Sequence, residues 1–237
     1  MNKNIYGFDM ENVRNFNDDV ILRNDIVVKP RAVSSSVPYR AIKRGLDIVI
    51  STFSIVILSP LMILICLLIM IDSRGPVLYV HNRIGKNGRP LPLFKFRSMC
   101  INAESMVNDF SPEQKAEWEQ NFKLDNDPRI TRIGRILRKT SLDELPQLFN
   151  ILTGDLSLVG PRPVVTEELE RYGENTDKFL SVTPGLTGYW QAYARNNCSY
   201  EKRMEMELYY VDNANLLWDV QIVFATFGAV ITGRGAK

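Results

Sequence analysis

Histidine and cysteine are scarce in this chain of 237 residues. His81 is the only histidine, which excludes metal sites built on histidine pairs and disfavours a serine–histidine triad. The three cysteines, Cys66, Cys100 and Cys198, are widely separated and form no CxxC motif. They argue against a disulfide framework or a zinc site and fit a reducing compartment. We interpret His81 as a residue on the surface of a β-strand rather than as a catalytic group.

The chain also lacks a large net charge. Its 29 Lys and Arg residues against 27 Asp and Glu residues give a charge of +2, so bulk charge does not indicate nucleic acid as a partner. No Walker, GxGxxG or RNP sequence is present. The length suits one catalytic-sized domain with appendages. Any partner must therefore be inferred from local patterns, and nucleic acid is not expected.

One long apolar run is present. Residues 48–71, IVISTFSIVILSPLMILICLLIMI, carry no charge over 24 positions, and as a helix they would be about 36 Å long, enough for a hydrocarbon core of about 30 Å. The run starts too late and is too long for a signal peptide, and no small-residue cleavage site follows it. We expect it to remain in the chain and to lie in a membrane.

Basic residues flank this run on both sides. They are Arg31, Arg40, Lys43 and Arg44 ahead of it, and Arg74, Arg83, Lys86, Arg89, Lys95 and Arg97 behind it. The positive-inside rule places both flanks in the cytoplasm. A segment that enters and leaves through one face satisfies the rule, and Ser59 and Pro60 at its midpoint would kink it, with the serine hydroxyl bonding a freed carbonyl. A kinked helix that spans the membrane once is the open alternative.

Three regions are expected from this pattern: a mobile tail over residues 1–40, a membrane segment over 41–75 and a cytoplasmic catalytic domain over 76–237. The tail is rich in Asn and Asp and has few large apolar runs. The motif Asn87-Gly88 lies between two strand-like arms and predicts a β-hairpin.

Two helices are also predicted. A polar helix starts at Ser111 and runs to about Phe122, with a proline at its first position and Gln114 placed to complete a capping box. The last apolar stretch contains Asp219 and Gln221 and is too polar to span a membrane. We favour packing in the core for it over a position along the membrane interface.

An acidic pair, Asp143 and Glu144, begins the stretch SLDELPQLFNILTGDLSLVGPRP. The spacing of Ser141 and Glu144 is that of a capping box, which would explain the glutamate alone. Pro146 complicates a helix that starts at Ser141, so either its first turn is distorted or the helix starts nearer the proline. Both versions place the two carboxylates at an exposed helix start, where the helix dipole favours their ionised forms.

Basic residues precede the acidic pair. They are Arg129, Arg132, Arg135, Arg138 and Lys139, and the motifs FKFRSM and GPRP add Lys95, Arg97 and Arg162. A solvated basic face is the ordinary explanation of such a run. Arginine suits bidentate phosphate contacts and lysine supplies a compact charge. Their position beside two carboxylates therefore favours a phosphate-binding site, with Arg129, Arg132 and Arg138 as candidates.

These motifs resemble the bacterial sugar transferases, the monotopic phosphoglycosyl transferases that start exopolysaccharide, O-antigen and glycoprotein-glycan assembly on undecaprenyl phosphate. The resemblance runs from about Tyr39 to Ala236. It rests on KRGLDIVIS, SPLM, DSRGPVLYVHNRIGKNGRPLPLFKFRSM, DPRITRIGRILRKTSLDELPQLFNILTGDLSLVGPRP and TPGLTGYWQAYARN. Larger members carry further membrane helices and a nucleotide-fold domain ahead of this core, for which a chain of this length has no room.

The resemblance implies an α+β, mostly helical fold: a re-entrant membrane helix broken at Ser59 and Pro60, a small β-hairpin, and a helical catalytic domain at the membrane surface. It implies that Asp143 is the nucleophile and that Glu144 holds Mg²⁺, with Asp143 near the metal. Basic positions expected around the phosphates and uridine are Lys95, Arg97, Arg162 and Arg195.

The expected reaction transfers a sugar 1-phosphate from a UDP-sugar to undecaprenyl phosphate at the inner leaflet of the bacterial cytoplasmic membrane, with the catalytic domain facing the cytoplasm. A homo-oligomer is left open. One alternative is direct attack by the lipid phosphate, with Asp143 as a metal ligand. A second is a non-catalytic membrane-anchored scaffold that binds anionic lipids.

Overall fold

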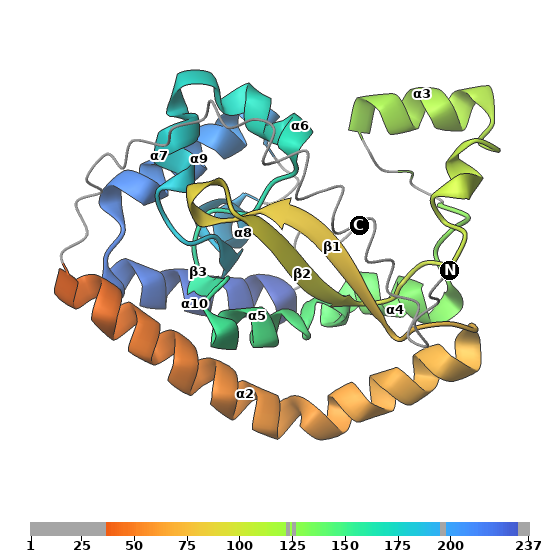
Figure 1. Ribbon diagram of the computed structural model, residues 1–237, viewed down its shortest axis with the longest axis horizontal. Helices are drawn as coiled ribbons and strands as arrows, with labels where there is room; N and C mark the ends of the chain where they lie inside the picture. The colour runs from red at the N-terminus through yellow and green to blue at the C-terminus, as the bar shows by residue number, and fades with distance from the viewer. Residues whose placement is uncertain (1–36, 122–123, 125–126, 195–197, 232–237) are drawn as a thin grey trace, which may run out of the picture.

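The computed structural model describes residues 37–121, 124, 127–194 and 198–231. Helices account for 63% of the structure and the sheets are small, so the prediction of a mostly helical α+β fold is confirmed. Helix α2 (Val37–Asp72) underlies the rest of the molecule (Figure 1). It begins inside the segment expected to be a tail. Residues 1–36 and Arg195 lie outside the described residues.

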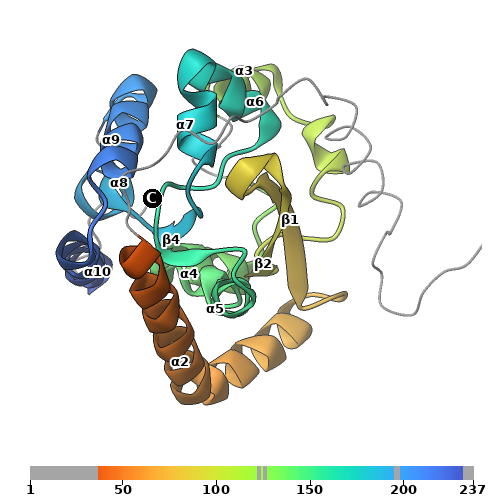
Figure 2. The ribbon, with the colours of Figure 1, turned by 60° about the vertical axis from the view of Figure 1, so that its left-hand side comes forward.

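Helix α2 is one continuous helix with a bend near its middle, visible from two directions (Figures 1 and 2). Pro60 lies inside it and has no N–H to donate to the carbonyl of Val56. The Ser59 hydroxyl donates to that same carbonyl at 2.8 Å. The expected roles of serine and proline at a kink are therefore confirmed.

A polar stripe on the first half of α2 fastens it to the domain above. Tyr39 and Lys43 both donate to Oδ2 of Asp219, at 2.9 Å and 2.8 Å. One turn further along α2, buried Asp47 accepts from the backbone N–H of Leu158 at 2.9 Å. Residues four apart share one face of a helix, so this side of α2 is committed to the domain and the other side is left apolar.

The far end of α2 is fastened to the same domain. Asp72 accepts from the backbone N–H of Ile133 at 3.1 Å, at the start of helix α4 (Arg132–Thr140). Just after the helix, Arg97 donates to the carbonyls of Ser73 and Arg74, at 2.7 Å and 3.0 Å. Both ends of α2 are thus held by one folded unit.

The predicted β-hairpin is present as β1 (Leu78–Ile84) and β2 (Pro90–Phe96), paired antiparallel with His81 opposite Leu93. The turn between them is the short helix η1 (Lys86–Gly88), in which Asn87 has a φ of 57°. Asparagine tolerates this left-handed region better than most residues. The Asn-Gly motif therefore predicted the turn correctly.

Helix α5 (Gln147–Thr153) lies against the hairpin and is joined to it by Asn150. This side chain is fully buried. Its Nδ2 donates to the Pro92 carbonyl at 2.8 Å, and its Oδ1 accepts from the Phe94 N–H at 3.0 Å. The buried amide thus satisfies one backbone donor and one backbone acceptor of β2, as a neighbouring strand would do. It also fixes the hairpin relative to the residues just before α5.

The helix predicted from Ser111 is also confirmed. Helix α3 spans Pro112–Asn121 and stands apart from the rest of the molecule (Figure 1). Ser111 Oγ accepts from the Gln114 N–H at 3.2 Å, and Ser111 N–H donates to Gln114 Oε1 at 3.0 Å. These reciprocal bonds are the expected capping box.

The C-terminal half packs around a short parallel pair, β3 (Ser157–Val159) and β4 (Gly185–Thr187). The remaining elements are η2 (Ser105–Val107), α6 (Thr166–Leu169), η4 (Glu170–Asn175), α7 (Thr176–Leu180), α8 (Tyr189–Tyr193), α9 (Tyr200–Asn213) and α10 (Leu216–Ile231). Helix α10 buries Asp219 and Ile222 and exposes Leu217, Phe224 and Phe227. The predicted packing in the core is therefore present on one face of α10, and the other face is exposed.

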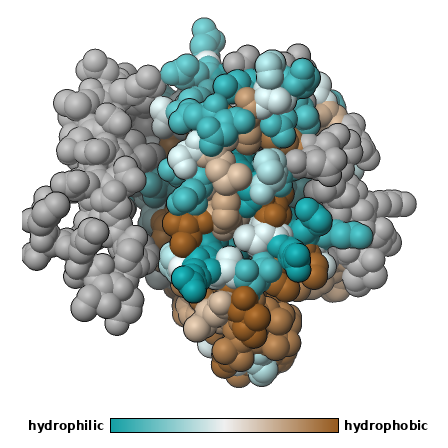
Figure 3. All heavy atoms as spheres, turned by 90° about the vertical axis from the view of Figure 1, so that its right-hand side faces the viewer, coloured by the Kyte–Doolittle hydropathy of each residue, from teal (hydrophilic) through white to brown (hydrophobic). Residues whose placement is uncertain are grey.

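Apolar side chains gather at the end of the molecule where α2 lies (Figure 3). In the part of the chain that the structure describes, α2 is the one helix long and apolar enough to cross a membrane, and only 11% of its most apolar stretch is buried. A core helix of a water-soluble protein would be mostly covered. The large exposed side chains of α2, such as Phe53, Val56 and Ile63, instead fit a surface that meets lipid.

We expect Asn150→Leu to destabilise the protein, because it leaves the Phe94 N–H and the Pro92 carbonyl buried without partners. The cost is on the order of 3 kcal/mol, which corresponds to a fall of about 6–12 °C in melting temperature for a chain of this size. The measurement is thermal unfolding of the purified protein in detergent. Asn213→Leu is the matched control, since Asn213 is exposed; equal melting temperatures for the two variants would refute the role given to Asn150.

Candidate active site

The hairpin contributes one wall of the site. Residues directly opposite one another in an antiparallel pair point to the same face, so His81 and Leu93 share a face, and Arg83 and Lys95 lie on it too. Leu93 is buried in the core. The charged side chains of Arg83 and Lys95 therefore lie at the edge of a packed apolar surface.

The acidic pair lies on a tight turn, not on the first turn of a helix. Helix α4 ends at Thr140, its C-cap Ser141 has a φ of 57°, and the turn η3 (Leu142–Glu144) follows directly. Helix α5 starts only at Gln147, after Pro146. Of the two arrangements expected around the proline, the one in which the acids precede the helix is confirmed.

The capping box expected at Ser141 and Glu144 is wrong. The Ser141 side chain makes no capping hydrogen bond. Ser141 has a left-handed backbone conformation at the end of α4, whereas the first residue of a capping box has an extended one. Glu144 Oε1 instead accepts from Lys95 Nζ at 2.8 Å. The glutamate is therefore engaged across the site by the hairpin.

These elements border a small pocket that is partly open to solvent. It is lined by His81, Arg83, Leu93, Lys95, Glu144, Gln147, Arg162, Pro163, Gly185, Leu186 and Gln191. Three permanent cations face one carboxylate in this space, together with two side-chain amides. Such a lining suits a ligand with more than one negative charge.

Glu144 and Asp143 have opposite electrostatic environments although they are neighbours. Burial acts to raise the pKa of Glu144, but Lys95 and Arg162 outweigh it and hold the pKa below its usual value. Burial raises the pKa of Asp143 to about 6, against the opposing charge of Lys95 and with the help of Glu144. Neighbouring acids whose pKa values are driven apart are typical of functional sites.

Asp143 is less accessible than the sequence led us to expect. Its residue is only 9% exposed, and it is not among the residues that line the pocket. The positive charges that act on its carboxylate are Lys95 and Arg138. The expectation that both acids are presented outward is therefore correct for Glu144 and wrong for Asp143.

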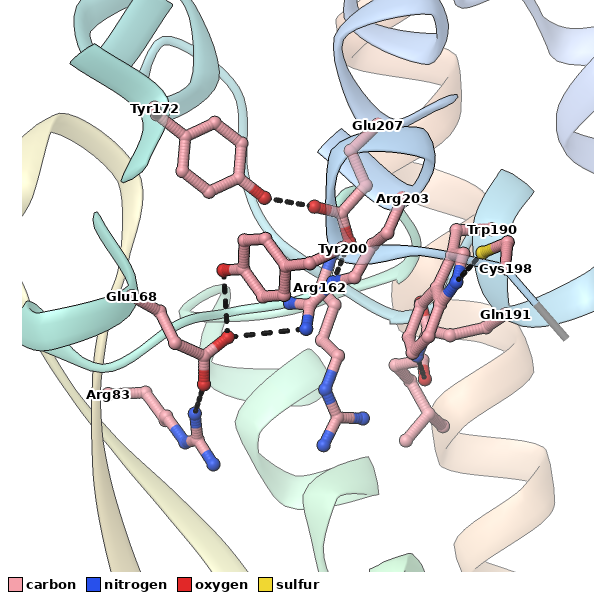
Figure 4. A network of polar contacts seen from close by, with 11 residues as sticks. Arg83, Arg162, Glu168, Tyr172, Trp190, Gln191, Cys198, Tyr200, Arg203 and Glu207 are labelled. Carbon is pink, nitrogen blue, oxygen red and sulfur yellow. Dashed lines mark hydrogen bonds and ion pairs between the residues drawn. The ribbon is translucent and has the colours of Figure 1, made fainter. Parts of the chain in front are cut away.

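Behind the pocket lies a network of alternating charges (Figure 4). Glu168 accepts from Arg83 at 3.2 Å and forms an ion pair with Arg203, also at 3.2 Å. Arg203 is paired in turn with buried Glu207 at 3.4 Å, and Glu207 accepts from the backbone N–H of Arg162 at 3.3 Å. In Figure 4 the guanidinium groups of Arg83 and Arg162 lie on the same side of this network.

Aromatic rings hold the centre of this network. The guanidinium of Arg203 lies over Trp190 and Tyr200, with its carbon 4.7 Å and 5.0 Å from the ring centroids. Such contacts favour a cation away from water. Tyr172 donates a short hydrogen bond to Glu207 from the other side. Arg203 is therefore rigid and supports the cations that reach the pocket.

The other basic residues predicted from the sequence lie elsewhere. Arg97 is buried and serves the end of α2, and Arg129 forms a buried bidentate pair with Asp127 at 2.7 Å and 2.8 Å. Arg132 is exposed on α4, and Arg138 donates to Ser98 Oγ at 2.8 Å. Of the predicted cations within the described residues, Lys95 and Arg162 line the pocket.

Sequence reasoning missed several lining residues. Arg83 was noted only as a flanking charge, His81 was set aside as a surface residue, and Gln147 and Gln191 were not considered. The strand alternation that links His81 and Arg83 to Lys95 across the hairpin was available as a signal. Glu168, which holds Arg83, had no such signal because it comes from a distant helix.

The chemistry of the acidic pair suits magnesium shared with a substrate. Mg²⁺ is commonly held by one or two carboxylates together with substrate phosphates and water. Among the described residues, no group of three or more His, Cys, Asp and Glu side chains forms a cage of its own. Glu144 faces the pocket, so it is the carboxylate that could reach an ion bound with a phosphate ligand.

Comparison with known proteins gives consistent matches. The family model for bacterial sugar transferases matches residues 38–233. An undecaprenyl-phosphate galactose phosphotransferase of Salmonella typhimurium is 48% identical over 200 residues, which cover 83% of this chain and 42% of the relative. A UDP-glucose:undecaprenyl-phosphate glucose-1-phosphate transferase of Escherichia coli is 37% identical over 195 residues, covering 79% and 39%.

Length separates the relatives into two kinds. The exopolysaccharide production protein ExoY of Rhizobium meliloti is 44% identical over 197 residues, which cover 82% of this chain and 87% of the relative. In contrast, the match covers only 42% of the Salmonella relative and 48% of a UDP-galactose-lipid carrier transferase of Erwinia amylovora. The chain thus spans less than half the length of several curated relatives that it matches.

We expect Asp143→Asn to stabilise the metal-free protein at neutral pH. An acid whose pKa is raised from 3.8 to about 6 on folding binds its proton more tightly in the folded state, so stability is lost as the pH rises from about 4 to 6. The asparagine avoids a loss of up to about 3 kcal/mol above this range and should match the wild type near pH 4. The measurement is unfolding as a function of pH in EDTA.

Glu144→Gln provides the contrast. Because the pKa of Glu144 is lowered on folding, its ionised form contributes stability above its unfolded pKa, and that contribution is lost as the pH falls. The glutamine variant should therefore be less stable than the wild type at neutral pH. Two variants that shift stability in the same direction at pH 7 would contradict the assigned environments.

Proposed function

The chain belongs to the bacterial sugar transferase family, and we propose that it transfers a sugar 1-phosphate from a UDP-sugar to undecaprenyl phosphate, with release of UMP. The observation that carries the proposal is the pocket in which Arg83, Lys95 and Arg162 face Glu144. A diphosphate ligand would find there both the charge and the geometry that arginine and lysine offer to phosphate oxygens.

The proposed reaction has two steps. A carboxylate oxygen of Asp143 attacks the phosphorus that carries the sugar, the bond from that phosphorus to the oxygen of UMP breaks, and UMP leaves with the bond electrons. An oxygen of the lipid phosphate then attacks the same phosphorus, which frees Asp143 and forms the lipid diphosphate sugar. The cations of the pocket lower the cost of bringing one anion to another.

Magnesium is part of the proposal. Glu144 would hold it together with the diphosphate, and it would supply additional positive charge to the departing phosphate. Lys95 donates to Glu144 at 2.8 Å and so orients the carboxylate. Its contact keeps Glu144 ionised and directed at the pocket.

The burial of Asp143 favours a second candidate route to the same product. Asp143 does not line the pocket, so it could act only on the metal while the lipid phosphate attacks the donor directly. The covalent route requires the turn η3 to present this carboxylate when the donor binds. The two routes differ in whether UMP is released before the lipid arrives.

The membrane placement is inferred from the attachment of α2. Lys43 at its first part bonds Asp219, and Asp72 at its last part bonds the start of α4. A helix held at both ends by one folded domain has both ends on one side of a membrane. We therefore infer that α2 enters and leaves through the inner leaflet, with the bend at Pro60 as its deepest point and the domain in the cytoplasm.

For the covalent route, wild-type protein given a UDP-sugar and magnesium without lipid should release up to one UMP per active site and gain the mass of one sugar phosphate. Asp143→Asn should do neither at any magnesium concentration. Glu144→Gln should recover part of the adduct at high magnesium, because it weakens only a metal ligand. The two measurements are UMP release and the mass of the intact protein, recorded after denaturation at low temperature. Asp109→Asn, an exposed carboxylate, is the matched control.

Each outcome of this experiment decides between the routes. Full turnover with lipid, but no adduct and no UMP without it, would rule out Asp143 as a nucleophile and support direct displacement. No magnesium-dependent UMP release even with lipid, across a panel of UDP-sugars, would refute the enzymatic proposal and support a lipid-binding scaffold.

The topology is tested with single cysteines at Arg40 and Asn87, in a chain whose Cys66, Cys100 and Cys198 are replaced by alanine. A thiol reagent that does not cross membranes should label neither position in intact spheroplasts and both after lysis. Labelling of Arg40→Cys alone in spheroplasts would show that α2 spans the membrane. Labelling of Asn87→Cys alone would place the catalytic domain outside the cell.

A further inference from the structure

The only histidine of the chain lies in the pocket. His81 is at the centre of β1, opposite Leu93, and it lines the cavity together with residues of six other segments. Among the described residues its imidazole makes no hydrogen bond; its ring contact is Tyr79, with centroids 6.0 Å apart. The ring is half-buried, and its nitrogens are not engaged by the part of the protein that the structure describes, so they are available to a ligand in the pocket.

Several charged groups face this imidazole. Arg83 comes from the same strand, Lys95 from β2, and Arg162 from the segment after β3, while Glu144 lines the cavity from η3. Burial lowers the pKa of His81 to about 3, and the repulsion of the three cations adds to the effect. The ring is therefore neutral at physiological pH while the cavity holds no anion.

A histidine has a particular advantage at this position. A fourth permanent cation would add repulsion to a cavity that already holds three, and an apolar residue would offer nothing to a phosphate. A neutral imidazole adds no charge to the empty cavity, still has an N–H to donate, and becomes a stronger donor as an anion raises its pKa.

We propose that His81 binds the diphosphate of the donor nucleotide, donating a hydrogen bond from its imidazole to a phosphate oxygen. The inference rests on the proposed function and adds a contact residue to it. Three cations and a polarisable donor suit a diphosphate better than a single phosphate ester, because the larger charge needs more partners. Gln147 lines the same cavity, as does Gln191, whose Nε2 donates to the Leu186 carbonyl at 3.0 Å.

The test uses the wild-type protein in detergent, without a histidine tag, so that its single histidine gives the only imidazole signals in a ¹⁵N NMR spectrum. Saturation with UDP and magnesium should shift the His81 signals and raise the pKa of the ring by at least one unit, since an opposite charge within about 4–6 Å has an effect of this size. Uridine, which lacks phosphates, should not raise it.

Variants give a second readout. His81→Leu should weaken UDP binding, measured by calorimetry, by about ten- to a hundred-fold, the usual effect of losing a hydrogen bond to a charged group. His81→Gln keeps an N–H donor and should lose less. Asn82→Leu, on the opposite face of the strand, is the matched control and should bind UDP as the wild type does.

The outcomes separate this inference from the one on which it rests. If UDP binds and the His81 signals and pKa stay unchanged, the inference is wrong and the proposed function stands. If UDP does not bind at all, both fail. If undecaprenyl phosphate in detergent raises the pKa and UDP does not, His81 contacts the acceptor lipid, and the assignment to the donor is overturned.

Discussion

Everything in this molecule depends on the attachment of one bent helix to one domain at both of its ends. Asp219 receives hydrogen bonds from Tyr39 and Lys43 near the start of α2, and Asp72 at its end caps helix α4. Pro60 makes the bend easier, but the two attachments determine where the ends lie. The two attachments consequently orient the apolar outer face of α2 relative to the polar domain.

The site shows how a fold can keep two neighbouring acids in different electrostatic environments. Lys95 and Arg162 stabilise the charge on Glu144, whereas burial opposes the charge on Asp143. An ionised carboxylate that is held in a destabilising environment is more reactive than one that is fully solvated or paired. The supporting network of Glu168, Arg203 and Glu207 lies outside the pocket, so the rigidity of its cations does not come from the reacting groups themselves.

The sequence predicted the features that depend on local patterns. The apolar run, the kink at Ser59 and Pro60, the Asn87 turn and the capped helix after Ser111 all follow from residues that are neighbours in the chain. Lys95 and Glu144 were also identified, and the structure places them in contact across the pocket.

The features that depend on tertiary contacts could not be predicted in this way. Nothing near Arg97 in the chain shows that it would serve the end of α2. Asp127 lies only two residues from Arg129, but the burial of that ion pair depends on packing that the local sequence does not show. The burial of Asp143 results from packing around the turn, and the role of Asn150 depends on a hairpin more than fifty residues earlier. Charge patterns indicate that cations gather, but not which of them remain available to a ligand.

The left-handed backbone of Ser141 has a consequence for how the motif should be interpreted in other chains. Its hydroxyl makes no capping bond, while its φ of 57° sets the direction in which the acidic turn leaves α4. What the position requires is therefore a backbone conformation rather than a hydroxyl group. Glycine and asparagine, which adopt this region with little strain, should substitute well here, and threonine, which keeps the hydroxyl but is β-branched, should not.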